Sequence, residues 1–364
     1  MNNAKNVISD IIEEKGPITF KEFMELALYH PQFGYYSTKE IEEDYITSSS
    51  FELFAKGLLV AFRDMLEKCG GDTIVEFGAG DGKLAEQISR KLNVNYIIVE
   101  KSQHMKEAAQ QRLEGFENVN FMDEPELENL QINGVVFTNE FFDALPVNVV
   151  VKDKNGELKE VYVDHRDDKF VELIQELSNP EIEDYFARLD IELEEGARAE
   201  VNLDAIHYIE RFSRILKEGF VLTIDYGFPS EELYTLERSD GTVACYTDHT
   251  YNFNPYIKVG EQDITSHVNF SALMEYGNES GLDLTGLTNH LYFLMSTLGE
   301  NEVDDFETAD EFKFLAFRMG SFKVLIQHKG MERPYLVCLQ MTPSFGYWNR
   351  YNYQGQLEME FLEE

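Results

Sequence analysis

The sequence has no long apolar run, few cysteines and a shortage of basic residues. No stretch approaches the roughly 18 apolar residues of a membrane-spanning helix, so we expect no membrane partner. The first residues lack a basic patch followed by an apolar run, so we expect no secretory signal. The three cysteines are far apart, and no C-x-x-C pair occurs. Reduced thiols and a cytoplasmic location are the expectation.

The shortage of basic residues excludes several classes of partner. There are 31 Lys plus Arg against 68 Asp plus Glu, a net charge of −37 over 364 residues. Nucleic acids and anionic membranes are bound through clustered Lys and Arg, so the composition argues against both. A basic protein partner fits the charge, although most of it is expected to be solvated surface. No His or Cys cluster has ligand spacing, so we expect no metal.

Apolar residues make up 43% of the chain, which is ample for a core, and their order predicts the fold. Short apolar strands are predicted at 73–77, 96–100, 119–122 and 134–138, and a fifth at 220–224. Helices are predicted between them at 83–92 and 103–113. Buried strands that alternate with helices indicate an α/β fold with a parallel sheet and right-handed crossovers. Closing strands are predicted at 322–327 and 335–341.

The remaining segments predict the domain organisation. Thr19 and Glu22 have capping-box spacing at the start of a second N-terminal helix. A hairpin is predicted at 147–163, a mostly helical acidic stretch at 172–195 and a loop-rich stretch at 229–264. We therefore predict an N-terminal helical cap at 1–68, a core in two parts at 69–150 and 196–345, and a hairpin and helical insertion at 151–195. A substrate-side loop insertion is predicted at 229–264 and a C-terminal tail at 346–364.

The turn after the first strand indicates a bound cofactor. Residues 76–82 read acid-x-G-x-G-x-G, in which Gly78, Ala79 and Gly80 let a ligand approach the backbone where the strand enters a helix. An NAD turn reads G-x-G-x-x-G, and here the third glycine comes one residue early. The Glu76 carboxylate suits a cationic ligand group such as the ammonium of S-adenosylmethionine (SAM). The spacing favours SAM over NAD.

Three polar residues at other strand ends extend this cofactor site. Glu100 ends the second strand, 20 residues beyond Gly80, where a carboxylate can accept the ribose hydroxyls of either cofactor. Asp123 follows the third strand and could bind an adenine amine, although a simple turn explains it equally well. Asn139 ends the fourth strand, beside the expected methyl donor.

Acids at the ends of the fourth and fifth strands are candidates for catalysis. Glu140 and Asp143 follow the fourth strand, and Asp225 with Tyr226 ends the fifth. The carboxyl ends of central strands face the ligand crevice of an open α/β sheet, so these residues should meet at one rim.

Together these segments resemble the MidA-like SAM-dependent methyltransferases, which include the mitochondrial complex I assembly arginine methyltransferase. The resemblance covers most of the chain from about residue 16 to the closing strands. Its most specific marks are N-E-x-x-D-A-L-P at 139–146 and Q-D-I-T at 262–265. Other marks are G-P-I-T-F at 16–20, P-Q-F-G-Y-Y at 31–36, T-S at 47–48, V-E-F-G-A-G at 75–80 and I-D-Y-G at 224–227.

The resemblance implies a class I methyltransferase, with a Rossmann-like, mostly parallel sheet, an antiparallel closing strand, a helical cap and insertions. It implies SAM as cofactor and a protein acceptor modified on an arginine side chain. It adds Asp263 and His267 to the catalytic candidates. It also implies a set of substrate-side residues: Thr47, Ser48, Tyr226, His249 and Gln262.

We therefore predict an enzyme that transfers the SAM methyl group to a protein acceptor by an SN2 reaction. The donor is already activated, so the protein mainly supplies alignment, which can contribute about 7–11 kcal/mol. Two alternatives stay open: a non-catalytic SAM-binding assembly or interaction factor, and an NAD-dependent oxidoreductase. The sequence leaves the oligomeric state undetermined.

Overall fold

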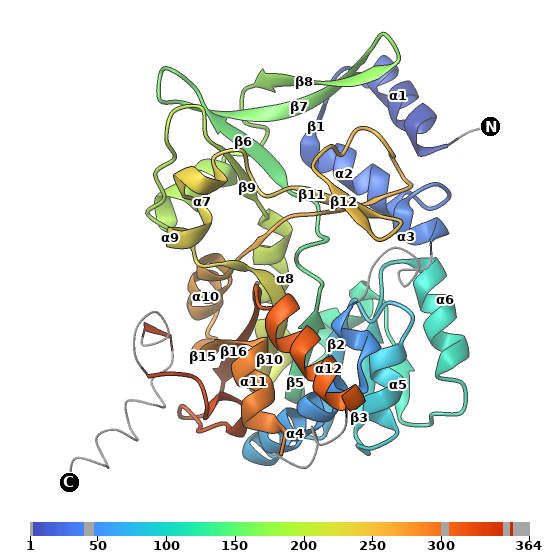
Figure 1. Cartoon of the computed structure of the whole chain (residues 1–364), viewed down its shortest axis with the longest axis vertical. Coiled ribbons are helices and arrows are strands. Elements are labelled where there is room, and N and C mark those ends of the chain that lie inside the picture. Colours follow the sequence, from blue (N-terminus) through green and yellow to red (C-terminus); the bar gives the residue numbers. More distant parts are fainter. Residues whose placement is uncertain (1–2, 40–46, 300–305, 345–349, 352–364) are drawn as a thin grey trace.

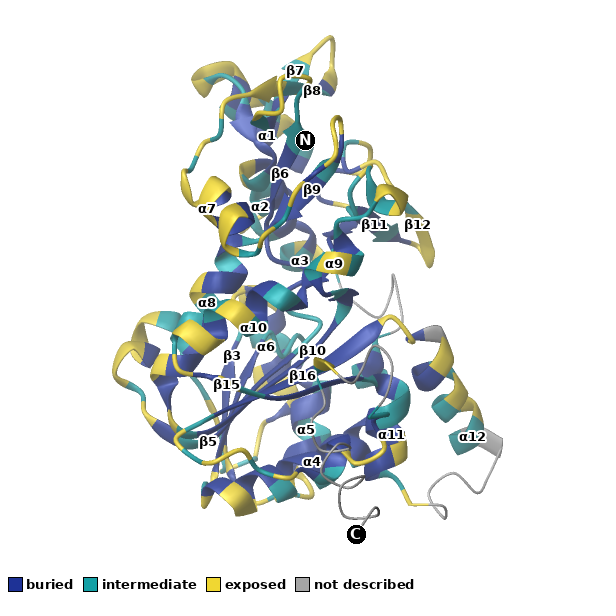
Figure 2. Ribbon diagram, turned by 90° about the vertical axis from the view of Figure 1, so that its left-hand side faces the viewer, coloured by how far each residue is buried: buried dark blue, intermediate teal, exposed yellow. Residues whose placement is uncertain are grey.

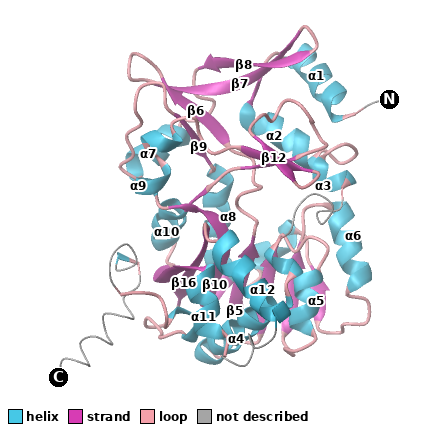
Figure 3. Cartoon of the chain, viewed as in Figure 1, coloured by secondary structure: helices cyan, strands magenta, loops and turns pink. Residues whose placement is uncertain are grey.

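The chain forms two lobes that lie one above the other in Figure 1. This computed structural model describes residues 3–39, 47–299, 306–344 and 350–351. The sheet lobe is built around an eight-stranded sheet, and the cap lobe contains two smaller sheets and the first three helices. Figure 3 shows that strands dominate the upper part of the cap lobe, whereas helices surround the sheet of the lower lobe.

The large sheet has the order β15-β16-β10-β5-β2-β3-β4, and β14 adds to the end of β10. The strands β4, β3, β2, β5 and β10 run parallel, and β16 runs antiparallel to both β10 and β15. Their bounds are β2 Thr73–Phe77, β3 Asn95–Val99, β4 Val119–Phe121, β5 Ile132–Asn139, β10 Leu216–Phe228, β14 Val268–Asn269, β15 Asp283–Asn289 and β16 Phe322–Lys329. The predicted parallel strands and the closing strand at 322–327 are confirmed.

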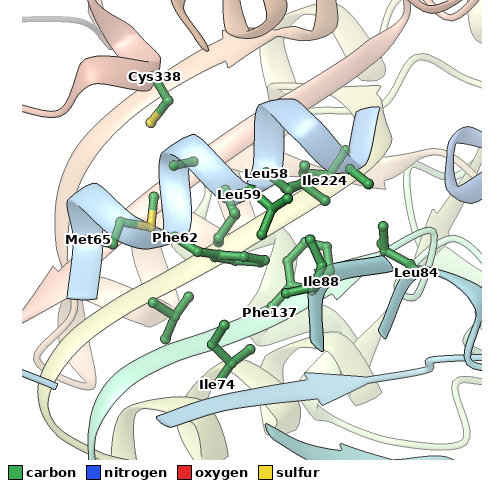
Figure 4. Close-up of a cluster of buried hydrophobic side chains, with 14 of the residues drawn as sticks. Leu58, Leu59, Phe62, Met65, Ile74, Leu84, Ile88, Phe137, Ile224 and Cys338 are labelled. Carbon is green, nitrogen blue, oxygen red and sulfur yellow. The ribbon is translucent and has the colours of Figure 1, made fainter. Parts of the chain in front are cut away.

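Helices bury both faces of this sheet, which is why its central strands are continuous apolar runs. One face packs on α4, α5, α6 and α11, and the other on α8 and α10. Figure 4 shows Leu58 and Phe62 of α4 lying over Phe137 and Ile224 of the sheet, and Figure 2 shows the central strands buried. The bounds are α4 Glu52–Cys69, α5 Lys83–Ser89, α6 Gln103–Arg112, α8 Leu203–Ile215, α10 Phe270–Glu279, α11 His290–Thr297 and α12 Phe306–Lys313.

The cap lobe joins three separate parts of the sequence in one core. Phe23 of α2, Val149 of β6, Cys245 of β11 and Ile264 of β13 all belong to its buried cluster. The predicted capping box of Thr19 and Glu22 starts α2. The bounds are α1 Ala4–Lys15, β1 Ile18–Thr19, α2 Phe20–Tyr29, α3 Tyr35–Thr38, β6 Asn148–Lys152, β7 Leu158–Arg166, β8 Lys169–Gln175, α7 Glu181–Arg188, β9 Arg198–Val201, β11 Ala244–Thr247, β12 Thr250–Asn252 and β13 Asp263–Thr265.

Several sequence expectations differ from the structure. The stretch 172–195 continues the hairpin as β8, which pairs with β7, and only α7 is helical. The strand expected at 335–341 is instead a 3-10 turn, η7 (Val337–Leu339). Its buried Cys338 and Leu339 pack on α11, on α4 and against the edge strand β15, without forming a β-ladder with that strand. The expected loop-rich insertion contains β11 and β12.

The domain boundaries stay a prediction, but two contacts bear on them. The helix α4, which we counted in the cap, packs on the large sheet. Most of the expected tail at 346–364 lies outside the described residues. The short elements that remain are η2 Ser48–Ser50, η3 Glu124–Asn129, α9 Ser230–Leu233, η4 Leu236–Arg238 and the π-helix η6 Phe314–Arg318. Across the described ranges, no helix has the length and apolar character needed to span a membrane.

Candidate active site

A cavity of about 740 Å³ lies at the carboxyl ends of β2, β3, β5 and β10, with walls from both lobes. The sheet lobe contributes the glycine turn after β2 and the loop after β5, and the cap lobe contributes tyrosines and the strand β13. The predicted residues that line the cavity are Thr47, Glu76, Gly78, Ala79, Gly80, Glu100, Asn139, Glu140, Asp143, Tyr226, Asp263 and His267.

The glycine turn forms a close-fitting cradle on one side of this cavity. Gly78 has a φ of +71°, and a Cβ atom there would lie 2.8 Å from Cδ2 of Phe141. The backbone N–H of Gly80 donates to Oε2 of Glu100 at 2.9 Å, and the N–H of Ser102 donates to Oε1 at 2.8 Å. The turn and the end of β3 are therefore fixed to one another by the Glu100 carboxylate.

Glu76 is a buried carboxylate with one neutral partner. The hydroxyl of Tyr96 donates to Oε2 of Glu76 at 2.9 Å, and no Lys or Arg in the described ranges pairs with it. Burial raises the pKa of Glu76 to about 7, and burial likewise raises the pKa of Glu100 to about 7. A buried carboxylate without a cation is complementary to a cationic ligand group.

The loop after β5 brings a second set of acids to the cavity. Glu140 has a φ of +52°, a left-handed conformation that costs energy for a residue with a side chain. Its Oε1 accepts the N–H of Ser48 at 3.1 Å and the amide of Asn139 at 3.2 Å, and Oγ of Ser48 lies 2.8 Å away. These bonds hold the Glu140 carboxylate at the cavity wall.

Asp143 and Asp263 reach the same cavity from different lobes. Asp143 is only 5% exposed, and its Oδ1 has no hydrogen-bond partner among the described residues. Burial, followed by the negative charges of Asp225, Asp263 and Glu140, raises the pKa of Asp143 well above its usual range. Oδ1 of Asp263 accepts the hydroxyl of Tyr36 at 2.9 Å. This crowding of acids favours a cationic occupant.

His267 is a neutral base in the cavity wall. Its ring packs edge-on against Tyr226 with centroids 5.4 Å apart, and its Nδ1 has no hydrogen-bond partner in the part of the chain that the structure describes. Burial, with the nearby charges of Arg238 and Lys323, lowers the pKa of His267 to about 4. The imidazole is therefore uncharged near neutral pH, and its lowered pKa makes it a weak base.

Asp225 requires a correction, because its carboxylate lies beneath the β5 loop and does not line the cavity. Its Oδ2 accepts the N–H groups of Phe141, Phe142 and Asp143 at 3.2, 2.9 and 3.3 Å. Its Oδ1 accepts the N–H of Tyr226 at 2.9 Å. We therefore reassign Asp225 from catalytic acid to a residue that positions the loop carrying Glu140 and Asp143.

Four other predicted residues also lie off the cavity wall. Ser48 is buried behind it and holds Glu140. Gln262 is fully buried and ties down the loop after β12 through Asn252 and Asn254. His249 is exposed at the β11–β12 turn, and Asp123 is exposed and paired with Lys106.

The sequence reasoning missed several cavity residues of the cap lobe. Tyr29 and Tyr36 stack with ring centroids 5.3 Å apart, and both line the cavity together with Tyr246 and Thr265. Tyr36 belongs to the P-Q-F-G-Y-Y mark of the resemblance, which was a usable signal. Tyr29 and Tyr246 carried no signal in the sequence, because only the docking of the cap on the sheet lobe brings them to the site.

Comparison with known proteins now decides the family. The profile of a family of S-adenosyl-L-methionine-dependent methyltransferases matches residues 53–288, more than half of the chain. This chain belongs to that family. The predicted MidA-like membership, enzyme class and SAM cofactor are confirmed, and the NAD-dependent alternative is set aside.

Three relatives extend this result. A Burkholderia thailandensis protein crystallised with S-adenosyl-homocysteine is 28% identical, with 93% of this chain and 94% of that chain covered and a TM-score of 0.81. A native crystal structure from the same organism is 29% identical, with 92% and 93% covered and a TM-score of 0.82. The class I methyltransferase fold is thereby confirmed. Protein arginine methyltransferase NDUFAF7 homolog, mitochondrial, of Drosophila melanogaster is 24% identical over 83% of this chain and 76% of the relative.

The residues of this methyltransferase fit SAM. Gly78 and Gly80 leave room at the backbone, Glu76 offers a carboxylate to the ammonium, and Glu100 offers lone pairs to the ribose hydroxyls. Asn139 lies next to them at the end of β5. The role of Asp123 at the adenine stays a prediction.

The raised pKa of Glu76 predicts that SAM affinity depends on pH. Only the carboxylate form of Glu76 attracts the ammonium, so we expect SAM affinity to rise as the pH increases through about 7. Below that pH, the loss of one proton from Glu76 raises the affinity by up to tenfold per pH unit. Isothermal titration calorimetry at a series of pH values measures this. Glu76→Gln should bind SAM more weakly, and the slope of the logarithm of affinity against pH should decrease by the contribution of one proton. An unchanged slope in Glu76→Gln would contradict the role of Glu76.

Proposed function

We propose that this methyltransferase modifies a cationic side chain of a protein acceptor, namely an arginine guanidinium. The observation that carries the proposal is the convergence of Glu140, Asp143 and Asp263 on one cavity. The loop of Glu140 and Asp143 also carries Phe141, which lies against Gly78. The Drosophila relative, a protein arginine methyltransferase by name, supports the same acceptor class.

The carboxylates supply recognition and alignment. A guanidinium presents planar N–H donors that carboxylates bind in pairs, so Glu140 and Asp263 can direct one nitrogen toward the glycine turn. When bound, SAM supplies the methyl group, which leaves the sulfonium sulfur as the acceptor nitrogen forms its new bond. The nitrogen must also lose a proton. Within the cavity wall, the carboxylate of Asp143, whose pKa is raised, is the stronger proton acceptor, and the imidazole of His267, whose pKa is lowered to about 4, is the weaker one.

The cap lobe shields this chemistry from water. Tyr29 donates its hydroxyl to the backbone oxygen of Ala144 at 3.0 Å, and Tyr36 donates to Asp263 at 2.9 Å. Tyr29 therefore fastens the cap to the loop after β5, and Tyr36 fixes the Asp263 carboxylate within the cap lobe. A drier cavity strengthens the attraction between the acids and a guanidinium.

The acceptor class can be tested directly. Methyl-labelled SAM and the purified enzyme are added to a cell lysate, and the labelled products are identified by mass spectrometry. We expect labelled protein with methylated arginine. Label confined to small molecules, lipids or other side chains would contradict the proposal while leaving the methyltransferase activity intact.

A substitution at Asp263 separates acceptor binding from cofactor binding. We expect Asp263→Ala to keep SAM affinity by calorimetry but to lower methyl transfer about a hundredfold, because the guanidinium is no longer aligned. Asp263→Asn keeps the shape and an acceptor for the Tyr36 hydroxyl, so a similar loss there assigns the effect to charge. Glu176→Ala, which removes an exposed acid of the cap lobe, serves as control. Full activity in Asp263→Ala would refute the assignment.

A further inference from the structure

We propose that Tyr251 and Phe253, next to the β11–β12 turn, form the docking surface for the acceptor protein. They would bind an apolar side chain of an extended acceptor segment, about three residues from the arginine that enters the cavity. This inference rests on the proposed function and adds a recognition site outside the cavity.

The strand register connects this surface with the cavity. Tyr246 of β11 lies directly opposite Asp263 of β13 and Tyr251 of β12. Directly opposed residues of antiparallel strands point to the same face, so Asp263, Tyr246 and Tyr251 form one row across the three-stranded sheet. Asp263 and Tyr246 line the cavity. The row therefore leads from the cavity wall to the surface.

The opposite face of the same sheet is committed to the core. Cys245 and Ile264 alternate with the residues of the row and are fully buried in the cap lobe. Strand alternation thus fixes which face carries Tyr251, and a one-residue slip of register would bury it. The orientation of the aromatic row is built into the fold.

The outer end of the row is an apolar patch open to solvent. Tyr251 is 68% and Phe253 72% exposed, their ring centroids lie 5.6 Å apart in an edge-to-face arrangement, and Ile257 follows at 55%. Aromatic side chains clustered beside a functional site are typical of binding surfaces. They contribute large contact area with few rotatable bonds.

The loop that carries this patch is already ordered. Gln262 accepts the side-chain amide of Asn252 at 3.0 Å and donates to the backbone oxygen of Asn254 at 2.9 Å. The N–H of Asn254 also donates to the side chain of Asn252 at 2.8 Å. A patch held in place before binding loses less entropy when the partner docks. This gives the predicted substrate-side residue Gln262 a positioning role.

Distance and charge specify the occupant. Asp263 and Tyr251 are two strand spacings apart, about 10 Å, which an extended chain at about 3.3 Å per residue covers in about three residues. The cavity end of the row is acidic and suits a guanidinium, whereas the outer end is aromatic and suits an apolar side chain. A segment with both features, at that spacing, matches the row.

The test compares two fluorescein-labelled glycine–serine peptides, each with one central arginine. The first carries a leucine three residues before the arginine and another three residues after it, and the second carries alanines at those places. Binding to the S-adenosyl-homocysteine complex is followed by anisotropy, and methylation is followed with labelled SAM. We expect the leucine peptide to bind the wild type about tenfold more tightly. The Tyr251→Ala, Phe253→Ala double variant should lose that preference and keep its affinity for the cofactor.

Ile174→Ala, which removes an exposed apolar residue of the separate strand β8, is the matched control and should behave as wild type. A wild type without preference for leucine, or a double variant that retains it, would overturn the docking surface. A preference in binding without methylation of either peptide would instead count against arginine as acceptor, so the two proposals can fail separately. Circular dichroism confirms that the double variant is folded.

Discussion

Replacing Gly78 with valine is expected to abolish SAM binding. The backbone at Gly78 has a φ of +71°, which β-branched residues essentially do not adopt, and a Cβ atom would meet the ring of Phe141 at 2.8 Å. The valine would either push Phe141 into the cavity or unwind the turn that Gly80 and Glu100 hold together. Calorimetry should show at least a hundredfold loss of affinity for SAM, equivalent to about 2.7 kcal/mol or more.

Backbone strain must be separated from loss of the site. Gly156 in the β6–β7 hairpin has a similar φ of +82°, but a Cβ atom there meets nothing within 4 Å. Gly156→Val should therefore cost stability without weakening SAM binding. If Gly78→Val bound SAM as tightly as the wild type does, the glycine turn would not be the cofactor site. That conclusion would hold whatever the acceptor is.

That the proposed cofactor residues meet at one cavity could be predicted from sequence, because their geometry is local. Glu76 and Gly78 lie at the end of one buried strand, and Glu100 ends the next. Parallel strands bring such ends to one sheet edge whatever the rest of the chain does. Asn139 and Glu140 follow by the same rule. The capping box at Thr19 was equally local, since its partners are three residues apart.

The acceptor half depends on contacts that no local pattern encodes. Tyr36 meets Asp263 across 227 positions of the chain, and Tyr29 reaches the backbone of Ala144. The small sheet of β11, β12 and β13 was not predicted from the sequence, because its strands are short and polar residues interrupt them. Its register nevertheless decides that Asp263 faces the cavity.

Asp225 shows the limit of reading function from strand ends. Like Glu76, it is an acid at the carboxyl end of a central strand, and sequence alone could not separate the two. In the structure, the side chain of Asp225 is fully buried and accepts four backbone N–H groups. Those hydrogen bonds, rather than contact with a substrate, explain why an acid occupies this position.

Asp225→Ala is therefore expected to cost both stability and activity. Each buried N–H left without a partner costs about 1–3 kcal/mol, and the substitution strands the donors of Phe141, Phe142 and Asp143. We expect the free energy of unfolding in urea to fall by about 3 kcal/mol or more. Methyl transfer should fall with it, since the loop that sets Glu140 loses its anchor. Asp225→Asn keeps one acceptor oxygen and should lose less of both.

Comparing Asp143→Asn with Asp225→Ala distinguishes the roles of these two acids. Burial raises the pKa of both acids, that of Asp225 to about 7, but Asp225 accepts four backbone N–H groups, whereas Oδ1 of Asp143 has no hydrogen-bond partner among the described residues. Removing the charge of Asp143 should therefore leave stability unchanged or raise it. Transfer should nevertheless fall, because the cavity loses an acid that faces the acceptor. Equal losses of stability in Asp143→Asn and Asp225→Ala would contradict this division. A loss of transfer without a loss of stability marks a residue that meets the acceptor, and a coupled loss marks one that holds the loop.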